Sequence, residues 1–172
     1  MSNVTTDQRS PEETLALYER GAKNLEALLA GLSEADLDLT RVPGEWSIRQ
    51  IVHHIAEGDA LFMVPIKSAL AQSGSTFVRN ALDPDPDAGP VALGLASRPV
   101  ESSVTLTKAI REQLSQLIRY VPDSWGHYVM MKSPEGDDGG RRMDVGLLVG
   151  IMVSHMAEHC DEIKTIREVH GR

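Results

Sequence analysis

Apolar residues recur at spacings of three and four in four segments of the chain, which is the pattern of amphipathic helices that each pack one face on a core. The connections between these segments lack that period. Four helices of this length, joined by connectors that let the chain turn back, pack most economically as an antiparallel four-helix bundle. The sequence therefore predicts an all-α fold, with helices over residues 11–30, 48–71, 99–120 and 145–169.

Capping residues mark where three of these helices begin. Ser10-Pro11-Glu12-Glu13 combines an N-cap serine, a proline at the first helical position and a glutamate placed for a capping box. Ser47-Ile48-Arg49-Gln50 is a second capping box, and Asp144 is an N-cap for the last helix. Pro65 lies inside the second helix, where its ring and its missing N–H predict a kink or a weakened turn.

The connectors are expected to carry the non-helical structure. Between 74 and 98 the chain contains Asp83-Pro84-Asp85-Pro86-Asp87-Ala88-Gly89-Pro90, whose prolines exclude a regular helix or a central strand. This long loop either borders a functional site or is a mobile excursion from the bundle. Residues 127–144 predict a small hairpin or an ordered loop. Residues 1–9 are polar and expected to be flexible, and nothing divides 1–172 into a second domain.

Two histidines of the last helix fall on its apolar stripe. His155 and His159 are four residues apart, so their rings stack one turn above the other and point the same way. Each ring carries polar nitrogens that need partners inside a core. A divalent metal held by both rings satisfies these nitrogens, and a hydrogen-bonded pair of core histidines is the alternative.

The second helix contains two adjacent histidines, His53 and His54, of which only one can face a given partner. On ideal helical geometry His54 lies roughly 110° from the centre of the apolar stripe and His53 roughly 150°. His54 is therefore expected to border the core, and His53 to point more towards solvent. Metal sites in bundles are built from side chains that project inwards from facing helices, so His54, His155 and His159 are expected to meet.

Several neighbouring residues are candidates for a role beside such a site. Asp59 and Glu162 fall on apolar stripes. Each is expected either to hydrogen-bond a histidine or relay its protons, or to form a buried salt bridge. Glu158 is expected either to take the same role beside the histidines or to lie on a solvated helix face. Cys160 points roughly 100° away from the preceding histidine and is expected to be a packed side chain rather than a ligand. Trp46 is expected to pack against the helix entry, or to stack on a substrate.

Two stretches of the chain resemble the DinB-like (damage-inducible-type) proteins. The run from Gly44 to Asp59, GEWSIRQIVHHIAEGD, is similar to the second-helix signature of that family, in which a histidine stands eight positions after the tryptophan; here it is His54. His155-Met156-Ala157-Glu158-His159 resembles the H-x-x-x-H motif of the last helix. Helix order, long connectors and length are also similar, so the resemblance covers nearly the whole chain. It implies an up-down-down-up four-helix bundle, usually a dimer, with a divalent metal on His54, His155 and His159.

The resemblance also implies a range of activities. Three neutral imidazoles with an open position are typical of a catalytic metal site, and no acidic fourth ligand can be read from the motifs. The metal is expected to be Zn or Ni, or else Fe or Mn, and to activate a water or a thiol as the nucleophile. Some relatives take a low-molecular-weight thiol as co-substrate, so the expected activities are a thiol-dependent S-transferase or isomerase, or a small metal-dependent hydrolase. The alternative is a non-catalytic dimeric bundle that acts as an interaction or stress-response module.

Composition narrows the classes of partner. The net charge of −8 disfavours binding to the phosphates of a nucleic acid. No apolar run approaches the roughly 18 residues of a membrane span, and the N-terminus does not resemble a signal peptide. A single cysteine excludes an internal disulfide and fits a reducing cytoplasm. Apolar residues of the first and third helices spread beyond one stripe, which together with the resemblance predicts a homodimer.

Overall fold

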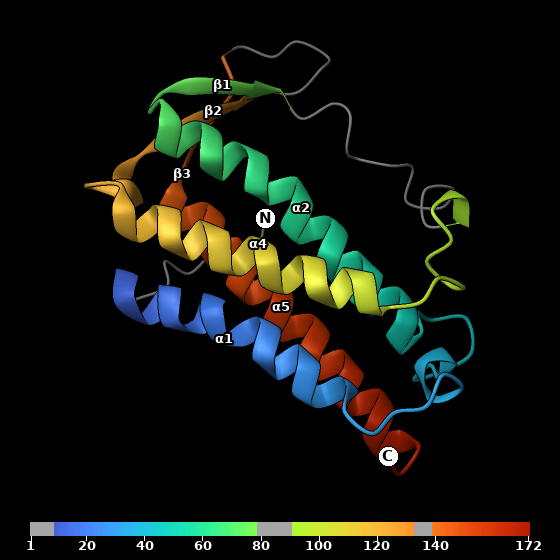
Figure 1. Ribbon diagram of the computed structural model, residues 1–172. Helices are drawn as coiled ribbons and strands as arrows, with labels where there is room; N and C mark the ends of the chain where they lie inside the picture. Colours follow the sequence, from blue (N-terminus) through green and yellow to red (C-terminus); the bar gives the residue numbers. More distant parts are fainter. Residues whose placement is uncertain (1–8, 79–90, 133–138) are drawn as a thin grey trace.

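The computed structural model describes residues 9–78, 91–132 and 139–172, and four long helices account for most of them. Each end of these helices lies within two residues of its predicted position. The chain runs one way along the first helix, back along the second and third, and forward again along the last, which confirms the up-down-down-up bundle (Figure 1). The helices are α1 (Pro11–Leu29), α2 (Ile48–Ala71), α4 (Glu101–Tyr120) and α5 (Val145–Val169).

Each helix of the bundle packs mainly against two others. Helix α2 lies against α4 and α5, and α1 lies against the same two helices from the opposite side. The neighbours α2 and α4 are parallel, as are α1 and α5, whereas α2 and α5 run antiparallel. Helix α2 therefore buries two of its faces, and a single apolar stripe underestimates how much of it is covered.

The predicted helix starts are confirmed by their hydrogen bonds. The Ser10 hydroxyl accepts from the Glu13 amide, and the Glu13 carboxylate accepts from the Ser10 amide at 2.8 Å. Ser47 and Gln50 form the same reciprocal box, and the Asp144 carboxylate accepts from the Leu147 amide at 2.8 Å. Helix α2 continues through its internal proline without interruption, so the predicted weak turn does not break it. Two short 3₁₀ turns, η1 (Asp36–Asp38) and η2 (Ser124–Gly126), precede α2 and follow α4.

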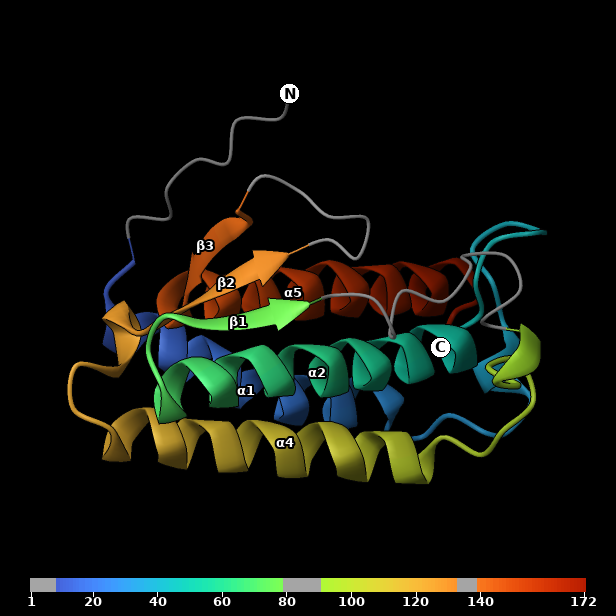
Figure 2. The same cartoon turned by 90° about the horizontal axis from the view of Figure 1, so that it is seen from above.

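A three-stranded sheet covers one end of the bundle, beside the C-terminal part of α2 (Figure 2). Its strands, in spatial order, are β1 (Ser75–Val78), β2 (Tyr128–Lys132) and β3 (Arg141–Asp144). The antiparallel pairing of β2 with β3 agrees with the hairpin predicted from 127 to 144. Strand β1 pairs in parallel with β2, and Ser75 lies opposite Val129, 54 positions later in the chain. This segment was predicted to be loop, because four residues are too few to show the alternation of a strand.

Two predicted features fall outside the residues that the structure describes. They are the proline-rich run Asp83-Pro84-Asp85-Pro86-Asp87-Ala88-Gly89-Pro90 and all but the last residue of the segment 1–9. Within the described part of the chain, none of the helices combines the length and the apolar character that a bilayer crossing requires.

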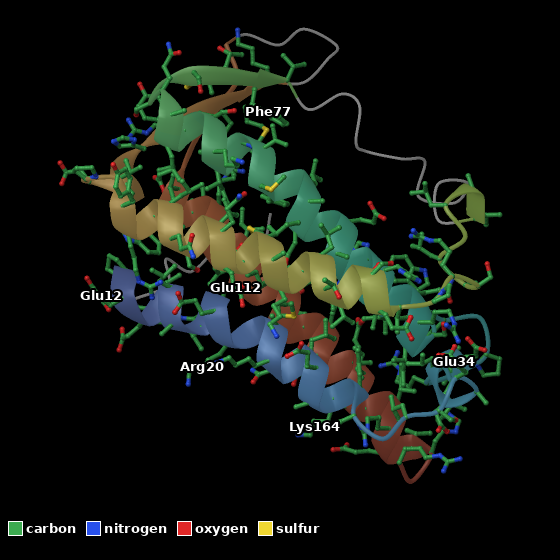
Figure 3. All side chains as sticks on the ribbon, viewed as in Figure 1. Glu12, Arg20, Glu34, Phe77, Glu112 and Lys164 are labelled. Carbon is green, nitrogen blue, oxygen red and sulfur yellow. The ribbon has the colours of Figure 1, made fainter. Side chains whose placement is uncertain are left out.

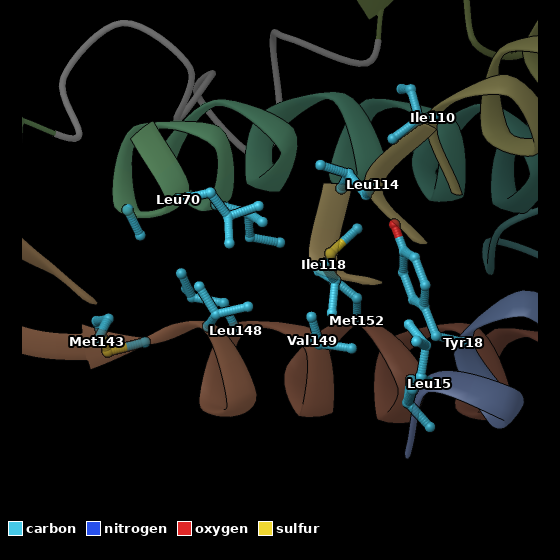
Figure 4. Packing of buried hydrophobic residues seen from close by; sticks show 14 of the residues in the cluster. Leu15, Tyr18, Leu70, Ile110, Leu114, Ile118, Met143, Leu148, Val149 and Met152 are labelled. Carbon is cyan, nitrogen blue, oxygen red and sulfur yellow. The ribbon is translucent and has the colours of Figure 1, made fainter. Parts of the chain in front are cut away.

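The apolar core consists of two clusters, one at each end of α2. The first packs the sheet and the start of α5 against α1 and α4, and Figure 4 shows Leu148 and Met152 of α5 within it. Phe77 of β1 packs against this cluster, whereas labelled charged residues such as Arg20 and Lys164 stand on the outer helix surfaces (Figure 3). The second cluster surrounds the first half of α2 and the second half of α5. Its fully buried members include Leu25, Ile48, Val52, Ile55 and Ile163.

A buried ion pair between the two clusters joins all four helices. Arg111 of α4 donates from Nε and Nη2 to the two carboxylate oxygens of Asp59 on α2, at 2.6 and 2.8 Å, and both side chains are 1% exposed. The same guanidinium donates to the backbone oxygens of Tyr18 in α1 and Met152 in α5, at 3.0 and 3.3 Å. Gly21 leaves room for it, since a Cβ there would lie 2.7 Å from Nη1 of Arg111.

Candidate metal centre

His54 of α2 and His155 and His159 of α5 come together between the two helices. One ligand atom from each ring can be chosen so that all three lie within 4.8 Å of one another. The ring centroids are 4.5 to 4.9 Å apart, and Nε2 of His54 lies 3.0 Å from Nε2 of His155. In the part of the chain that the structure describes, no other group of three His, Cys, Asp or Glu side chains is close enough to hold a metal.

Glu162 fixes the orientation of one of these rings. Nδ1 of His159 lies 2.8 Å from a carboxylate oxygen of Glu162, one helical turn further along α5. A carboxylate only accepts, so Nδ1–H is the donor and Nε2 keeps its lone pair for a cation. The Glu162 side chain is 55% exposed, so the burial expected from the apolar stripe was wrong, although the residue does lie where a hydrogen-bond partner for the site is needed.

Burial keeps the other two rings in the uncharged form that a ligand requires. Removal from water lowers the pKa of His54, and the nearby His159 lowers it further. The pKa of His155 falls to about 4, because burial disfavours the imidazolium and because His159, His54 and Arg111 repel the added proton. Near neutral pH both rings therefore present lone pairs, as metal coordination demands.

These side chains fit a divalent cation. Around a tetrahedral Zn²⁺ with Zn–N distances of about 2.1 Å, two ligand nitrogens lie roughly 3.4 Å apart. The 3.0 Å contact between the Nε2 atoms of His54 and His155 is close to that spacing. Two lone pairs at that distance repel unless one nitrogen carries a proton or a cation lies between them. The third ring, His159, uses its Nδ1–H for the hydrogen bond to Glu162. Its Nε2 is therefore free to be the third metal ligand.

His53 is not a solvent-facing residue, so that prediction was wrong. Its side chain is fully buried, with Nδ1 2.8 Å from the Ser103 hydroxyl and Nε2 3.1 Å from the backbone oxygen of Arg98. The segment that leads into α4 covers this face of α2, which the period of α2 alone does not reveal. His53 therefore ties α2 to α4 and points away from the three-histidine cluster.

The remaining candidates take different positions. Asp59 is buried and paired, as one of its two alternatives required, and the structure gives its carboxylate to Arg111 rather than to a histidine. Glu158 is exposed. Cys160 is a packed side chain whose thiol contacts the Met156 sulfur at 3.6 Å, and burial raises its pKa to about 11.

Trp46 borders the centre from the connector before α2. Its ring meets that of His54 edge-on, with centroids 4.7 Å apart. Trp46 and His159 also line a hollow of about 480 Å³, whose apolar lining includes Ile51 and Ile166. A hollow of this size is within the range of small-molecule sites. The other lining residues are mostly charged: Arg41, Glu45, Glu158, Asp161, Glu162 and the neutral Thr165.

Comparison with protein families agrees with this geometry. The sequence model of the DinB superfamily matches residues 17–163, which include His54, His155 and His159. The chain belongs to the DinB superfamily. The family resemblance read from the Gly44–Asp59 run and the H-x-x-x-H motif is thereby confirmed, and so is the bundle that it implied.

The chain is also similar to named proteins, at low sequence identity. A protein of Geobacillus kaustophilus, provisionally named a metal-dependent hydrolase, is 22% identical over 163 residues, which are 93% of this chain and 85% of the relative. YfiT from Bacillus subtilis, described as a probable metal-dependent hydrolase with an unusual four-helix bundle topology, superposes with a TM-score of 0.79 at 17% identity, over 99% of this chain and 93% of YfiT.

A mycothiol-dependent maleylpyruvate isomerase is also similar in structure. It superposes with a TM-score of 0.65 at 16% identity over 90% of this chain, which spans 61% of the isomerase. At such identities the two solved structures show a shared fold. The curated relative and YfiT both carry names that point to metal-dependent chemistry.

Proposed function

We propose that this DinB protein is a divalent-metal-dependent enzyme whose metal ligands are His54, His155 and His159. The observation that carries the proposal is the convergence of three imidazoles from two helices, with their candidate ligand atoms within 4.8 Å of one another. Three protein ligands leave a coordination position open for a reactant, which is the usual difference between a catalytic and a structural zinc site. Zn²⁺ and Ni²⁺ suit imidazole ligands.

The surrounding residues have separate tasks in this proposal. Glu162 accepts the Nδ1–H of His159, which holds the ring in place and makes its Nε2 a better donor. Trp46 packs edge-on against the His54 ring and so limits how that ring can turn. A divalent cation bound there would act as a Lewis acid and lower the pKa of a coordinated water or thiol. The hollow beside His159 would take the part of the substrate that does not react.

Two reaction classes are consistent with this centre. The Geobacillus relative and YfiT favour hydrolysis, in which water is the nucleophile. The mycothiol-dependent isomerase favours a low-molecular-weight thiol as co-substrate. Titration of the Co²⁺- or Ni²⁺-loaded protein with small thiols separates the two, since a thiol bound to the metal changes its absorption spectrum. We expect such a change if thiols are co-substrates, and an unchanged spectrum with turnover of esters or amides if the enzyme is a hydrolase.

A thermal melt tests the metal centre itself. Added Zn²⁺ or Ni²⁺ at a hundred times its Kd should stabilise the folded protein by about 2.7 kcal/mol at pH 7.5. For a chain of this size that corresponds to a rise in Tm of about 5–10 °C. The rise should shrink strongly at pH 5, because protons compete for histidine ligands whose unfolded pKa is about 6.5.

The metal-free protein should show a pH dependence of the same origin. Because the pKa of His155 is lowered in the folded state to about 4, its contribution to stability is present above the unfolded pKa and is lost as the pH falls from about 6.5 towards 4. Melts without metal across that range measure it. A metal-induced rise in Tm that is equal at pH 5 and pH 7.5 would contradict coordination by histidines, and no rise at either pH would favour a bundle without a working metal site.

A further inference from the structure

Gly58 lies in the middle of α2, one helical turn after His54. Glycine is unfavourable inside a helix, because it loses more backbone freedom on folding than any other residue. A Cβ at this position would lie 2.9 Å from Cε1 of His155, and 3.4 and 3.7 Å from its Nδ1 and Nε2. Side chains do not approach a Cβ within 3.0 Å, so the His155 ring occupies space that any other residue at position 58 would need.

Two neighbouring rings limit how the His155 ring can move away from such a side chain. They are His54, with the Nε2 atoms 3.0 Å apart, and His159, with centroids 4.5 Å apart and rings nearly perpendicular. A methyl group on residue 58 would make the ring rotate or slide, and Nε2 would move with it. Metal coordination tolerates errors of only about 0.2 Å in ligand distance, so a displacement of that kind is large for a ligand.

The helices cannot separate easily to relieve the contact. Asp59 follows Gly58 directly, and its carboxylate holds Arg111, which also donates to the Met152 backbone oxygen of α5. Helices α2 and α5 are therefore linked through a buried guanidinium close to the level at which the His155 ring rests on α2. A larger residue at position 58 would act on the ring rather than on the spacing of the helices.

We propose that Gly58 is a positioning residue of the metal centre: its missing side chain lets His155 lie on the α2 backbone and direct Nε2 at the point shared with His54 and His159. The inference rests on the proposed function, because the ligand that needs this arrangement is the metal. Gly58 offers no side-chain ligand to the metal, and its role is to leave the space that the His155 ring occupies.

The first experiment compares two glycine-to-alanine substitutions in helix interiors. Gly58→Ala should weaken Zn²⁺ binding by about 10- to 100-fold, the effect expected when the support of a ligand is disturbed. Gly150→Ala is the matched control, since Gly150 lies inside α5 and a Cβ there meets nothing within 4 Å. The control should bind Zn²⁺ like the wild type. Equal affinities of all three proteins, measured by competition with a chelating dye, would overturn the proposal.

A second experiment needs no metal and remains informative if Gly58→Ala folds poorly. Melts of the metal-free protein compare Gly58→Ala in the wild type and in a His155→Ala background. Without the ring, alanine should raise Tm by about 2–4 °C through its helix propensity. With the ring, it should give no increase or a decrease. Equal shifts in both backgrounds would show that the two residues do not interact, and would also overturn the inference.

The two experiments separate this inference from the proposed function. A wild type that binds no metal would refute the function, whereas the melts would still decide whether His155 rests on Gly58. A wild type that binds metal, together with a Gly58→Ala variant that binds it equally well, would leave the function intact and remove the role of Gly58.

Discussion

Replacement of His155 by alanine should abolish stoichiometric binding of Zn²⁺ or Ni²⁺. His155 contacts both of the other rings, with its Nε2 3.0 Å from that of His54 and its ring centroid 4.5 Å from that of His159. Its loss leaves two imidazoles, and two neutral ligands hold a divalent cation far more weakly than three. Metal content after gel filtration, measured by elemental analysis, should fall from one equivalent per chain to near zero. The variant should remain folded, since the His155 ring is only half-buried and alanine is a good helix former.

His53→Ala is the matched control for that experiment. His53 is adjacent to His54 and fully buried, but its nitrogens contact Ser103 and the backbone of Arg98. The substitution leaves a buried hydroxyl without its partner, which should cost about 1–3 kcal/mol of stability. It should therefore lower Tm and leave one equivalent of metal in place. Equal loss of metal in the His53 and His155 variants would contradict the assignment of His54 as a ligand.

The helices of this bundle could be predicted because their determinants are local. The side chains of Ser10, Ser47 and Asp144 each cap a helix by accepting a hydrogen bond from the backbone amide three residues later. The 3.6-residue period of apolar positions can likewise be read from each helical segment alone. The preference for His54 over His53 as the ligand also came from the geometry of one helix. The structure places His54 in the cluster, although His53 is the more deeply buried of the two. His155 and His159 of α5 could be recognised as a pair from their spacing of four residues alone.

The features that could not be predicted depend on contacts between distant segments. His53 is covered by the residues that lead into α4, and nothing in α2 records their presence. Strand β1 exists because Ser75–Val78 finds β2 more than fifty residues later. The period of α2 placed Asp59 in the core with a partner, but the choice of Arg111 is a property of the packed bundle. Gly58 carries no chemical group, so only its distance to His155 reveals a role.

The second large effect is expected at the buried ion pair. Asp59→Ala would leave the Arg111 guanidinium, 1% exposed, without a counter-charge in the middle of the bundle. Breaking one partner of such a pair typically costs about 3–5 kcal/mol, which for a chain of this length lowers Tm by roughly 6–20 °C. The control is Glu19→Ala at the solvent-exposed pair with Arg119, where the loss should stay below about 1 kcal/mol. Thermal and urea unfolding measure both.

A double variant, Asp59→Ala with Arg111→Met, then separates stability from function. Replacing both charges by apolar side chains removes the uncompensated cation, and buried pairs exchanged in this way often lose little stability. The Arg111→Met substitution also removes the hydrogen bonds from the guanidinium to the backbone oxygens of Tyr18 and Met152, so recovery of Tm should be incomplete. If Asp59 only pairs with Arg111, the double variant should bind one equivalent of metal at close to the wild-type affinity. If Asp59 also relays protons for the centre, the double variant should regain most of its Tm and bind metal, but its activity should stay low across the whole pH range.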